Sequence, residues 1–222
     1  GAVIGLAERI AARNGIDGAV FWPANSAHIL DPPPVDVVVC EVLGNLAFEE
    51  NAIETLADAR RFLRPGGVVI PNSIEQFLAP VTTPRLHEEL CSWDDTGVDL
   101  DFSDAKTTSF DNVYVRRFAP EELLYGESGV RSWDRAVFNV ELSGHRAGQA
   151  SWHLEAPVTL YGFALWWCCE LVPGIELSTS PFAAPTHWEQ VYLPVMQPIA
   201  GRAGDEVSVE IASETGGGDG ID

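Results

Sequence analysis

The first residues of the chain repeat apolar side chains every three or four positions, which is the spacing of one face of an α-helix. The apolar stripe in residues 2–14 consists of Val3, Leu6, Ala7 and Ile10. Asn14 and Gly15 follow the stripe, and both are common residues at the end of a helix. We therefore predict a helix over residues 2–14.

The next segments alternate between strand-like and helix-like patterns. Residues 35–40 read VDVVVC, an almost continuous apolar run that is typical of a strand covered on both faces. Residues 50–63 have a helical period, and the Pro-Gly-Gly sequence at 65–67 is expected to end that helix before a strand at 68–71. A shorter strand is predicted at 19–22. This order of strand, helix and strand predicts a parallel sheet in an α/β region.

Beyond residue 76 the pattern is that of β-strands without strong helices between them. The strand-like stretches are FNVEL (138–142), SWHLEA (151–156), TLYGFALWW (159–167), WEQVYLPV (188–195) and EVSVEIAS (206–213). We predict an antiparallel sandwich or barrel at 77–222, after the α/β region at 1–76. Within it, the acidic and aromatic residues 93–118 have weak periodicity and are expected to extend away from the body. The glycine-rich and acidic tail at 214–222 has no predicted structure.

Composition restricts the partners of such a protein. The chain has 13 basic and 33 acidic residues in 222, a net charge of −20, which would repel nucleic-acid phosphates and anionic lipids and attract cations. It has no apolar run near the roughly 20 residues that a membrane helix needs. Cysteine and histidine spacings match no metal site, so we expect no metal, free thiols and a cytoplasmic protein. The cysteines are Cys40, Cys91, Cys168 and Cys169.

Three separated segments carry candidate chemistry. Residues 61–71, RFLRPGGVVIP, place a Pro-Gly-Gly turn between a helix and a strand. Residues 40–51, CEVLGNLAFEEN, place Glu41 at the end of a strand and Glu50 nine residues later at a helix start. Residues 177–190 contain a Thr-His-Trp sequence at 186–188. Isolated loop glutamates are most often solvated surface acids, and a histidine beside tryptophan is often a packing residue, so these alternatives stay open.

In their order, these segments resemble the protein arginine methyltransferases, which belong to the class I S-adenosylmethionine-dependent methyltransferases. EVLGNLAFEE resembles the double-glutamate loop of that family, and Thr186, His187 and Trp188 match its Thr-His-Trp loop. Barrel segments of the family resemble FLAPV (77–81), YGFALWW (161–167) and LPVMQPI (193–199). The resemblance implies a partial Rossmann-type methyltransferase domain, an antiparallel β-barrel and a homodimer. Residues 93–118 would correspond to the family's dimerisation arm.

The resemblance also implies roles for individual residues. Glu41 and Glu50 would hold the substrate guanidinium and act in catalysis with His187, Trp188 would border the substrate, and Glu49 would be a bystander. The border of S-adenosylmethionine would be formed by Asn25, Ser26, Ala27, His28 and Glu41. A carboxylate suits this chemistry because it accepts two N–H groups of a guanidinium side by side. Two carboxylates would orient the cation and withdraw charge from the nitrogen that is methylated.

The sequence also departs from the family. Val42, Leu43 and Asn45 stand where many members have aromatic and methionine residues. No glycine-rich turn after a strand precedes the first helix, so we expect the N-terminal cofactor-binding part to be lacking and these 222 residues alone to bind the cofactor poorly. The expected substrate is arginine in a basic protein or peptide. The alternatives are a small guanidino compound and a non-catalytic scaffold.

Overall fold

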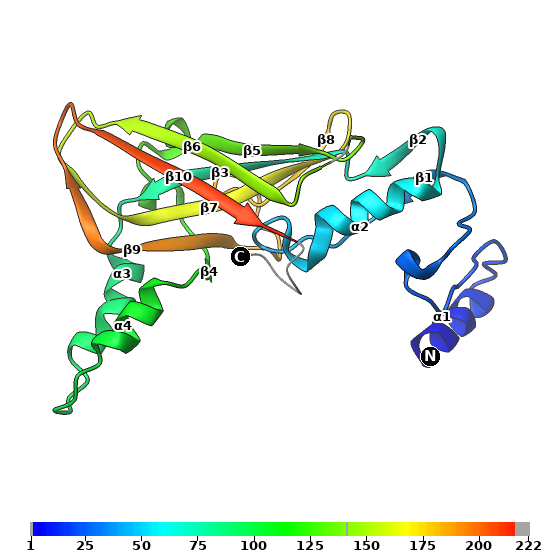
Figure 1. The fold of residues 1–222 in the computed structure, drawn as a ribbon, viewed down its shortest axis with the longest axis horizontal. Helices are drawn as coiled ribbons and strands as arrows, with labels where there is room; N and C mark the ends of the chain where they lie inside the picture. Colours follow the sequence, from blue (N-terminus) through cyan, green and yellow to red (C-terminus); the bar gives the residue numbers. More distant parts are fainter. Residues whose placement is uncertain (1, 141, 216–222) are drawn as a thin grey trace.

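The computed structural model describes residues 2–140 and 142–215, in which two kinds of β pairing divide the chain (Figure 1). The N-terminal region contains a parallel pair of strands and the rest of the chain contains antiparallel sheets. The elements of the first region are α1 (Ala2–Arg13), η1 (Ser26–His28), β1 (Val35–Val39), η2 (Glu49–Asn51), α2 (Ala52–Ala59), η3 (Arg60–Phe62) and β2 (Leu63–Ile70). The predicted first helix and the strand–helix–strand unit are confirmed.

The ends of the second helix and its following strand differ from the prediction. The helix begins at Ala52, because Glu50 and Asn51 have left-handed backbone angles, with φ of 59° and 56°. It ends at Ala59, and a short 3₁₀ turn leads into β2. The Pro-Gly-Gly sequence at 65–67 lies inside β2, where the pairing with β1 shifts register. Residues 19–22 form no strand.

The expected burial of the first region is also wrong. Val37 and Val39 of β1 are 48% and 72% exposed, so the strand is not covered on both faces by the residues described. The apolar stripe of α1 also faces outward, with Val3 78% exposed. In Figure 1, α1 lies at the opposite end of the molecule from the helices of the second region. A continuous apolar run therefore marked a strand correctly but did not reveal which side of it would be covered.

The second region is antiparallel, as predicted. Its elements are β3 (Ser73–Val81), α3 (Arg85–Leu90), η4 (Cys91–Asp94), α4 (Ser103–Phe110), β4 (Tyr114–Arg116), η5 (Pro120–Glu122), η6 (Gly126–Gly129), β5 (Arg131–Val137), β6 (His145–His153), β7 (Val158–Val172), β8 (Ile175–Ser178), β9 (Gln190–Gly201) and β10 (Glu206–Glu214). One sheet has the order β4-β9-β7-β3-β5 with β8 beside β7, and the other pairs β10 with β6. Neither sheet closes on itself in the part of the chain that the structure describes. Apolar side chains fill the space between the sheets, including Leu78, Trp152, Leu160 and Phe163.

Individual strands agree unevenly with the sequence pattern. The predictions at 159–167 and 206–213 are confirmed as parts of β7 and β10. The prediction at 138–142 is wrong, because β5 ends at Val137 and residues 138–140 form a turn. Phe138 is nevertheless 1% exposed and lies edge-on to Phe48, with ring centroids 6.4 Å apart. Its apolar character reflects a contact between the two regions. Residues 216–222 of the predicted unstructured tail lie outside the described residues.

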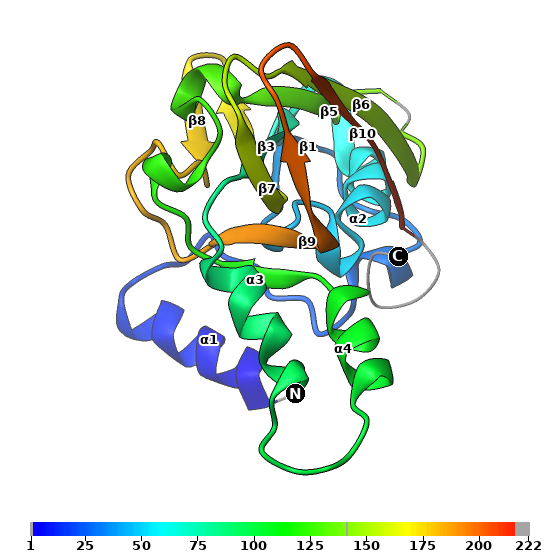
Figure 2. The same ribbon diagram turned by 90° about the vertical axis from the view of Figure 1, so that its left-hand side faces the viewer.

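The segment at 93–118 extends from the body, as predicted. Helices α3 and α4 project from the sheet in both views, and the chain returns through β4 (Figures 1 and 2). The projection, which we call the arm and define as residues 85–113, begins before the predicted boundary because α3 is part of it. Inside the arm, Lys106 Nζ lies 2.6 Å from Asp94 Oδ2. Among the described helices, none has the length and apolar character that a membrane crossing requires.

A hydrophobic cluster joins the two regions and fixes the position of the acidic loop at 41–51. It contains Leu43, Ala47, Phe48, Ala52, Ile53, Leu56, Val69, Ile74, Ala136, Phe138, Trp167 and Cys169. The loop contributes three of these side chains, α2 contributes three, and β7 of the antiparallel sheet contributes the last two. Burying such side chains stabilises the fold by roughly 1.5–3 kcal/mol each, so the loop is anchored although its acids are not buried.

Candidate functional site

The acidic loop, residues 41–51, exposes its predicted acids while its apolar side chains are buried. Glu41 follows β1, Glu50 precedes α2, and both are exposed. Between them, Gly44 and Ala47 form an isolated antiparallel bridge that turns the chain back. Ala47 has a positive φ of 40°, in addition to those of Glu50 and Asn51. Residues other than glycine rarely adopt such angles, so the packed surroundings hold the loop in a strained shape.

Gly44 is required by close packing within this loop. A Cβ atom at this position would lie 1.7 Å from Glu49 Oε2 and 2.4 Å from Glu49 Cβ. The half-buried Glu49 side chain thus occupies the space that glycine leaves free. The sequence predicted a tight turn at Gly44 and a bystander at Glu49. In the structure the two residues pack against each other. Glu49 therefore lies in the loop interior, whereas its neighbour Glu50 is exposed.

The segment containing Thr186, His187 and Trp188 lies against the acidic loop. Trp188 Nε1 donates a hydrogen bond of 2.9 Å to the Leu43 carbonyl oxygen. The backbone N–H of Glu189 donates a hydrogen bond of 2.9 Å to Asn45 Oδ1. These bonds join residues more than 140 positions apart in the chain. The structure therefore brings together the two segments that the sequence analysis singled out separately.

Aromatic contacts hold His187 and Trp188 in place. The Trp167 and Trp188 rings meet edge to face with centroids 5.3 Å apart, and Trp167 Nε1 donates to the Gly44 carbonyl oxygen at 3.0 Å. The His187 ring centroid lies 3.7 Å from that of Trp188. Thr186 Oγ1 donates to the Trp188 carbonyl oxygen at 3.0 Å, which closes the short loop. His187 is exposed, so its imidazole is open to solvent.

Four of the residues predicted at the cofactor, Asn25 to His28, lie beside Arg61. Asn25 to His28 form η1 with its cap, in which the Ala27 N–H donates to Asn25 Oδ1 at 3.0 Å, and all four residues are exposed. Arg61 holds this turn by donating to the carbonyl oxygens of Ser26, at 2.6 Å, and of Ile29.

Arg61 also bonds Asp58. Arg61 lies just past the C-terminal end of α2, whereas Glu50 lies just before the N-terminal end of that helix. An eight-residue helix is about 12 Å long, so α2 separates the acidic loop from the Arg61 anchor. The structure thus joins residues 186–189, which include His187 and Trp188, to the loop between Glu41 and Glu50. It places η1 near the far end of α2.

The thiols near the site are poor candidates for a nucleophile. Burial, and then the charge of Glu41, raises the pKa of Cys40. Burial, followed by the charge of Glu176, raises the pKa of Cys168 to about 11. A thiol with so high a pKa stays protonated at neutral pH, and the thiolate is the reactive form. The exposed carboxylates and the imidazole are therefore the groups with usable chemistry here.

Residues 73–216 match the family model described as the arginine methyltransferase oligomerization subdomain. The chain belongs to the arginine methyltransferase family. Protein arginine N-methyltransferase 6 of Xenopus laevis is 30% identical over 206 residues, a match that covers 86% of this chain and 60% of the relative. The chain thus spans less than two thirds of that relative's length.

Solved structures show the same fold as this family member. The Trypanosoma brucei PRMT1 enzyme–prozyme heterotetrameric complex with AdoHcy matches with a TM-score of 0.85 and 20% identity, over 99% of this chain and 71% of that one. Arabidopsis thaliana protein arginine methyltransferase 10, in an open conformation, matches with a TM-score of 0.69 and 19% identity, over 94% and 68% of the two chains. At these identities the likeness establishes the fold and leaves the activity to be argued from the site.

Sequence reasoning missed several residues that hold the site together in this arginine methyltransferase family member. Asn45 was noted as a departure from the family, yet its side chain accepts the Glu189 N–H. Trp167 lies in a segment noted only for its resemblance to the family's barrel, and its indole N–H also bonds the acidic loop. Arg61 was not singled out. None of these contacts has a local sequence signal, because each joins segments that are far apart in the chain.

Proposed function

We propose that the protein transfers the methyl group of S-adenosylmethionine to a guanidino nitrogen of arginine in a basic protein or peptide. The observation that carries this proposal is the attachment of residues 186–189 to the acidic loop through Trp188, Glu189 and Trp167. In this proposal the imidazole of His187 faces the loop that carries Glu41 and Glu50. Membership of the arginine methyltransferase family supports the same reaction.

The two glutamates act on the substrate as orienting acceptors. A guanidinium is planar, permanently charged and presents its N–H groups in a rigid fork that fits a carboxylate. With Glu41 at one end of the loop and Glu50 at the other, the carboxylates hold the plane of the cation and draw its charge away from the reacting nitrogen. S-adenosylmethionine supplies the electrophilic methyl group when it is bound. Because the loop is anchored by buried side chains, its acceptors are preorganised.

His187 is the group that receives or relays the proton released from the guanidinium. Its stacking on Trp188 fixes the direction of the ring, and its exposure leaves a route for the proton to water. In its neutral form an imidazole has one ring nitrogen that can accept a proton. Trp188 contributes mainly by fastening the loop, since its indole N–H is already bonded to Leu43.

Residues 25–28 fit one border of a cofactor site. They are exposed, and the carbonyl oxygens on either side of the turn are held by Arg61, so the turn is rigid but uncovered. An adenine ring buried in a pocket would need further cover from outside these residues. In this proposal residues 25–28 and Glu41 form the border of the cofactor site. The proposal also divides the chain into half of a Rossmann-type domain at 1–76 and a β-barrel substrate domain at 77–222.

The proposal includes a homodimer formed through the arm and a cytoplasmic location. The oligomerization subdomain matched by residues 73–216 includes the arm, which supports the first part. The four free cysteines support the second, because thiols persist in a reducing compartment. The net charge of −20 favours a basic partner over nucleic acid or an anionic membrane.

The test is methyl transfer by the full-length protein from labelled S-adenosylmethionine to an arginine-rich peptide. Glu50→Gln is expected to lower kcat/KM about 100-fold to 1,000-fold, because one oriented charged acceptor is lost. In the double variant Glu41→Gln/Glu50→Gln, the total loss of kcat/KM should be smaller than the product of the two single losses, since the acids act together. Glu49→Gln is the matched control in the same loop and should retain transfer.

Three results would contradict the proposal. Full transfer by Glu50→Gln would exclude the pair of acids as the clamp. Transfer to free arginine or agmatine, with none to peptides, would favour a small guanidino substrate. No transfer to either acceptor, with an intact dimer, would favour a non-catalytic scaffold.

A further inference from the structure

Gln190 is a buried polar residue at the start of β9, directly after the Thr-His-Trp-Glu sequence at 186–189. It is 6% exposed. Its side-chain Oε1 accepts the backbone N–H of Phe118 at 2.9 Å, and its Nε2 donates to the Thr179 carbonyl oxygen at 2.7 Å. The side chain thus satisfies two buried backbone groups from two different segments, and only an amide offers both a donor and an acceptor in this shape.

A continuous series of hydrogen bonds leads from Gln190 to the acidic loop. Thr179, which accepts from Gln190, pairs with Trp167: its N–H donates to the Trp167 carbonyl oxygen at 3.0 Å, and its Oγ1 accepts the Trp167 N–H at 3.1 Å. The indole of Trp167 then donates to Gly44. Thr179 is 2% and Trp167 1% exposed, so these bonds are shielded from water. In such surroundings a lost partner is costly, which makes the series rigid.

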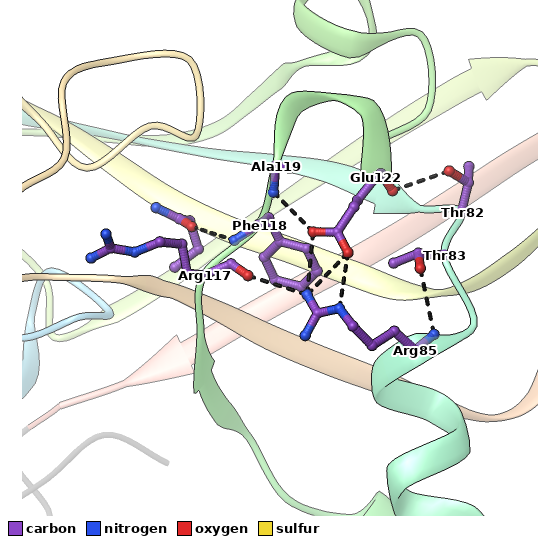
Figure 3. Close-up of polar contacts among 8 residues, drawn as sticks. Thr82, Thr83, Arg85, Arg117, Phe118, Ala119 and Glu122 are labelled. Carbon is purple, nitrogen blue, oxygen red and sulfur yellow. Dashed lines mark hydrogen bonds and ion pairs between the residues drawn. The ribbon is translucent and has the colours of Figure 1, made fainter.

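In the other direction, Gln190 reaches the root of the arm. Phe118 follows β4, where the arm rejoins the sheet, and Arg116 lies opposite Gln190 in the β4–β9 pairing. The outgoing end of the arm is fastened at the same place. Arg85 at the start of α3 donates to both carboxylate oxygens of Glu122, at 3.0 and 3.2 Å, and to the Arg117 carbonyl oxygen at 3.3 Å (Figure 3).

The Glu122 carboxylate also accepts the Ala119 N–H at 2.9 Å, and its backbone carbonyl accepts the Thr82 hydroxyl at 3.1 Å. Figure 3 shows the contacts of Thr82, Arg85 and Ala119 meeting at Glu122. Both ends of the arm and the backbone N–H that Gln190 accepts are therefore parts of one hydrogen-bonded assembly. On the surface, the Arg117 side chain adds a second link to the site, 3.4 Å from Glu189 Oε1 and 3.5 Å from the Thr186 carbonyl oxygen.

We infer that Gln190 is a positioning residue for the candidate site. It fixes the position of residues 186–189 and of the acidic loop relative to the root of the arm. This inference rests on the proposed function for its catalytic consequence. Gln190 contacts neither Glu41 nor Glu50. It acts on the acidic loop through Thr179 and Trp167. It acts on residues 186–189 directly, because it follows Glu189 in the chain. Both effects turn the acids and His187 toward the same substrate.

The experiment replaces the amide by a side chain of similar length without hydrogen-bonding groups, Gln190→Met, in the full-length protein. Amide hydrogen exchange of residues 43–47 and 186–189 is expected to become about tenfold faster, because the local structure opens more easily. If the parent protein transfers methyl groups, kcat should fall about tenfold to 100-fold with little change in KM for the peptide, as expected for misplaced catalytic groups.

Two control variants separate positioning from general stability. Gln149→Met makes the same replacement at an exposed position of β6 and should change neither exchange nor kcat. Leu154→Ala removes a side chain that is 2% exposed between the two sheets and should lower the melting temperature without a selective effect on the two loops.

The inference would be overturned if Gln190→Met exchanged the amide hydrogens of the two loops at the rate of the parent protein. It would also be overturned if Leu154→Ala accelerated exchange selectively in the same two loops. Faster exchange with unchanged kcat in an active enzyme would also overturn it. An inactive parent would refute the proposed function alone, because the exchange measurement still decides whether Gln190 holds the loops.

Discussion

At the scale of single residues, the acidic loop combines exposed acids with tightly packed neighbours. Glu41 and Glu50 point to solvent, yet Phe48 between them is 1% exposed, and Glu49 fills the space above Gly44. The buried apolar side chains anchor the loop, and Glu41 Oε1 adds a long hydrogen bond of 3.5 Å from the Leu43 N–H. The solvation of the two acids also keeps the cost of their charges low.

Gly44→Ala is expected to destabilise the protein by about 1–3 kcal/mol, because the new Cβ would overlap the side chain of Glu49 and force the loop to shift. The melting temperature measured by calorimetry should fall accordingly. Gly18→Ala is the matched control, since a Cβ at Gly18 meets no atom within 4 Å. An unchanged melting temperature for Gly44→Ala would show that the loop is more adaptable than its packing indicates.

At the scale of elements, the arm carries exposed apolar side chains near its tip. Val98 is 58% and Leu100 70% exposed, between η4 and α4. Apolar side chains grouped at the end of a projection are typical of a contact with another protein. In the proposed homodimer this tip packs against the second subunit.

Leu100→Glu is therefore expected to raise the dimer dissociation constant about 30-fold, which is the effect of losing roughly 2 kcal/mol at an interface centre. Sedimentation velocity at micromolar concentration measures the shift toward monomer. Ile175→Glu is the matched control, because Ile175 is 57% exposed in β8, outside the arm. A monomeric parent, or a Leu100→Glu variant that sediments like the parent, would exclude the arm tip as the dimer contact.

At the scale of the whole molecule, the net charge of −20 surrounds a site that is itself acidic. Such a field attracts a cationic substrate from a distance and is weakened by salt, since the Debye length falls from about 10 Å at 0.1 M to about 3 Å at 1 M. In the proposed reaction, the charge of the whole surface acts on substrate capture, whereas Glu41 and Glu50 act on orientation.

The KM for an arginine-rich peptide is expected to rise several-fold between about 0.05 and 0.5 M sodium chloride, with kcat nearly constant. Initial rates at the two salt concentrations measure both constants. A peptide with one arginine among neutral residues is the control and should show a weaker dependence. Equal salt effects on both peptides would mean that the acidic surface does not select the substrate.

Much of the local structure could be predicted from the sequence. The spacing of apolar residues correctly indicated α1, β7 and β10, and Gly44 correctly indicated a turn. These features depend on neighbours within a few positions, where side-chain direction and backbone preference act directly. The order of the three candidate segments along the chain was sufficient to recognise the family, which the family match confirms.

The rest was decided by contacts between distant segments. The Pro-Gly-Gly sequence continues β2 because β1 lies beside it, and Phe138 is buried because Phe48 meets it. Trp188 bonds Leu43 across 145 positions, and Gln190 joins the arm to the site through groups that have no signal in their own neighbourhood. The sequence by itself determined the family and the residues to which the proposed chemistry is assigned. Only the tertiary structure decided how they are held, because a buried hydrogen bond is specified by the partner that folding brings to it.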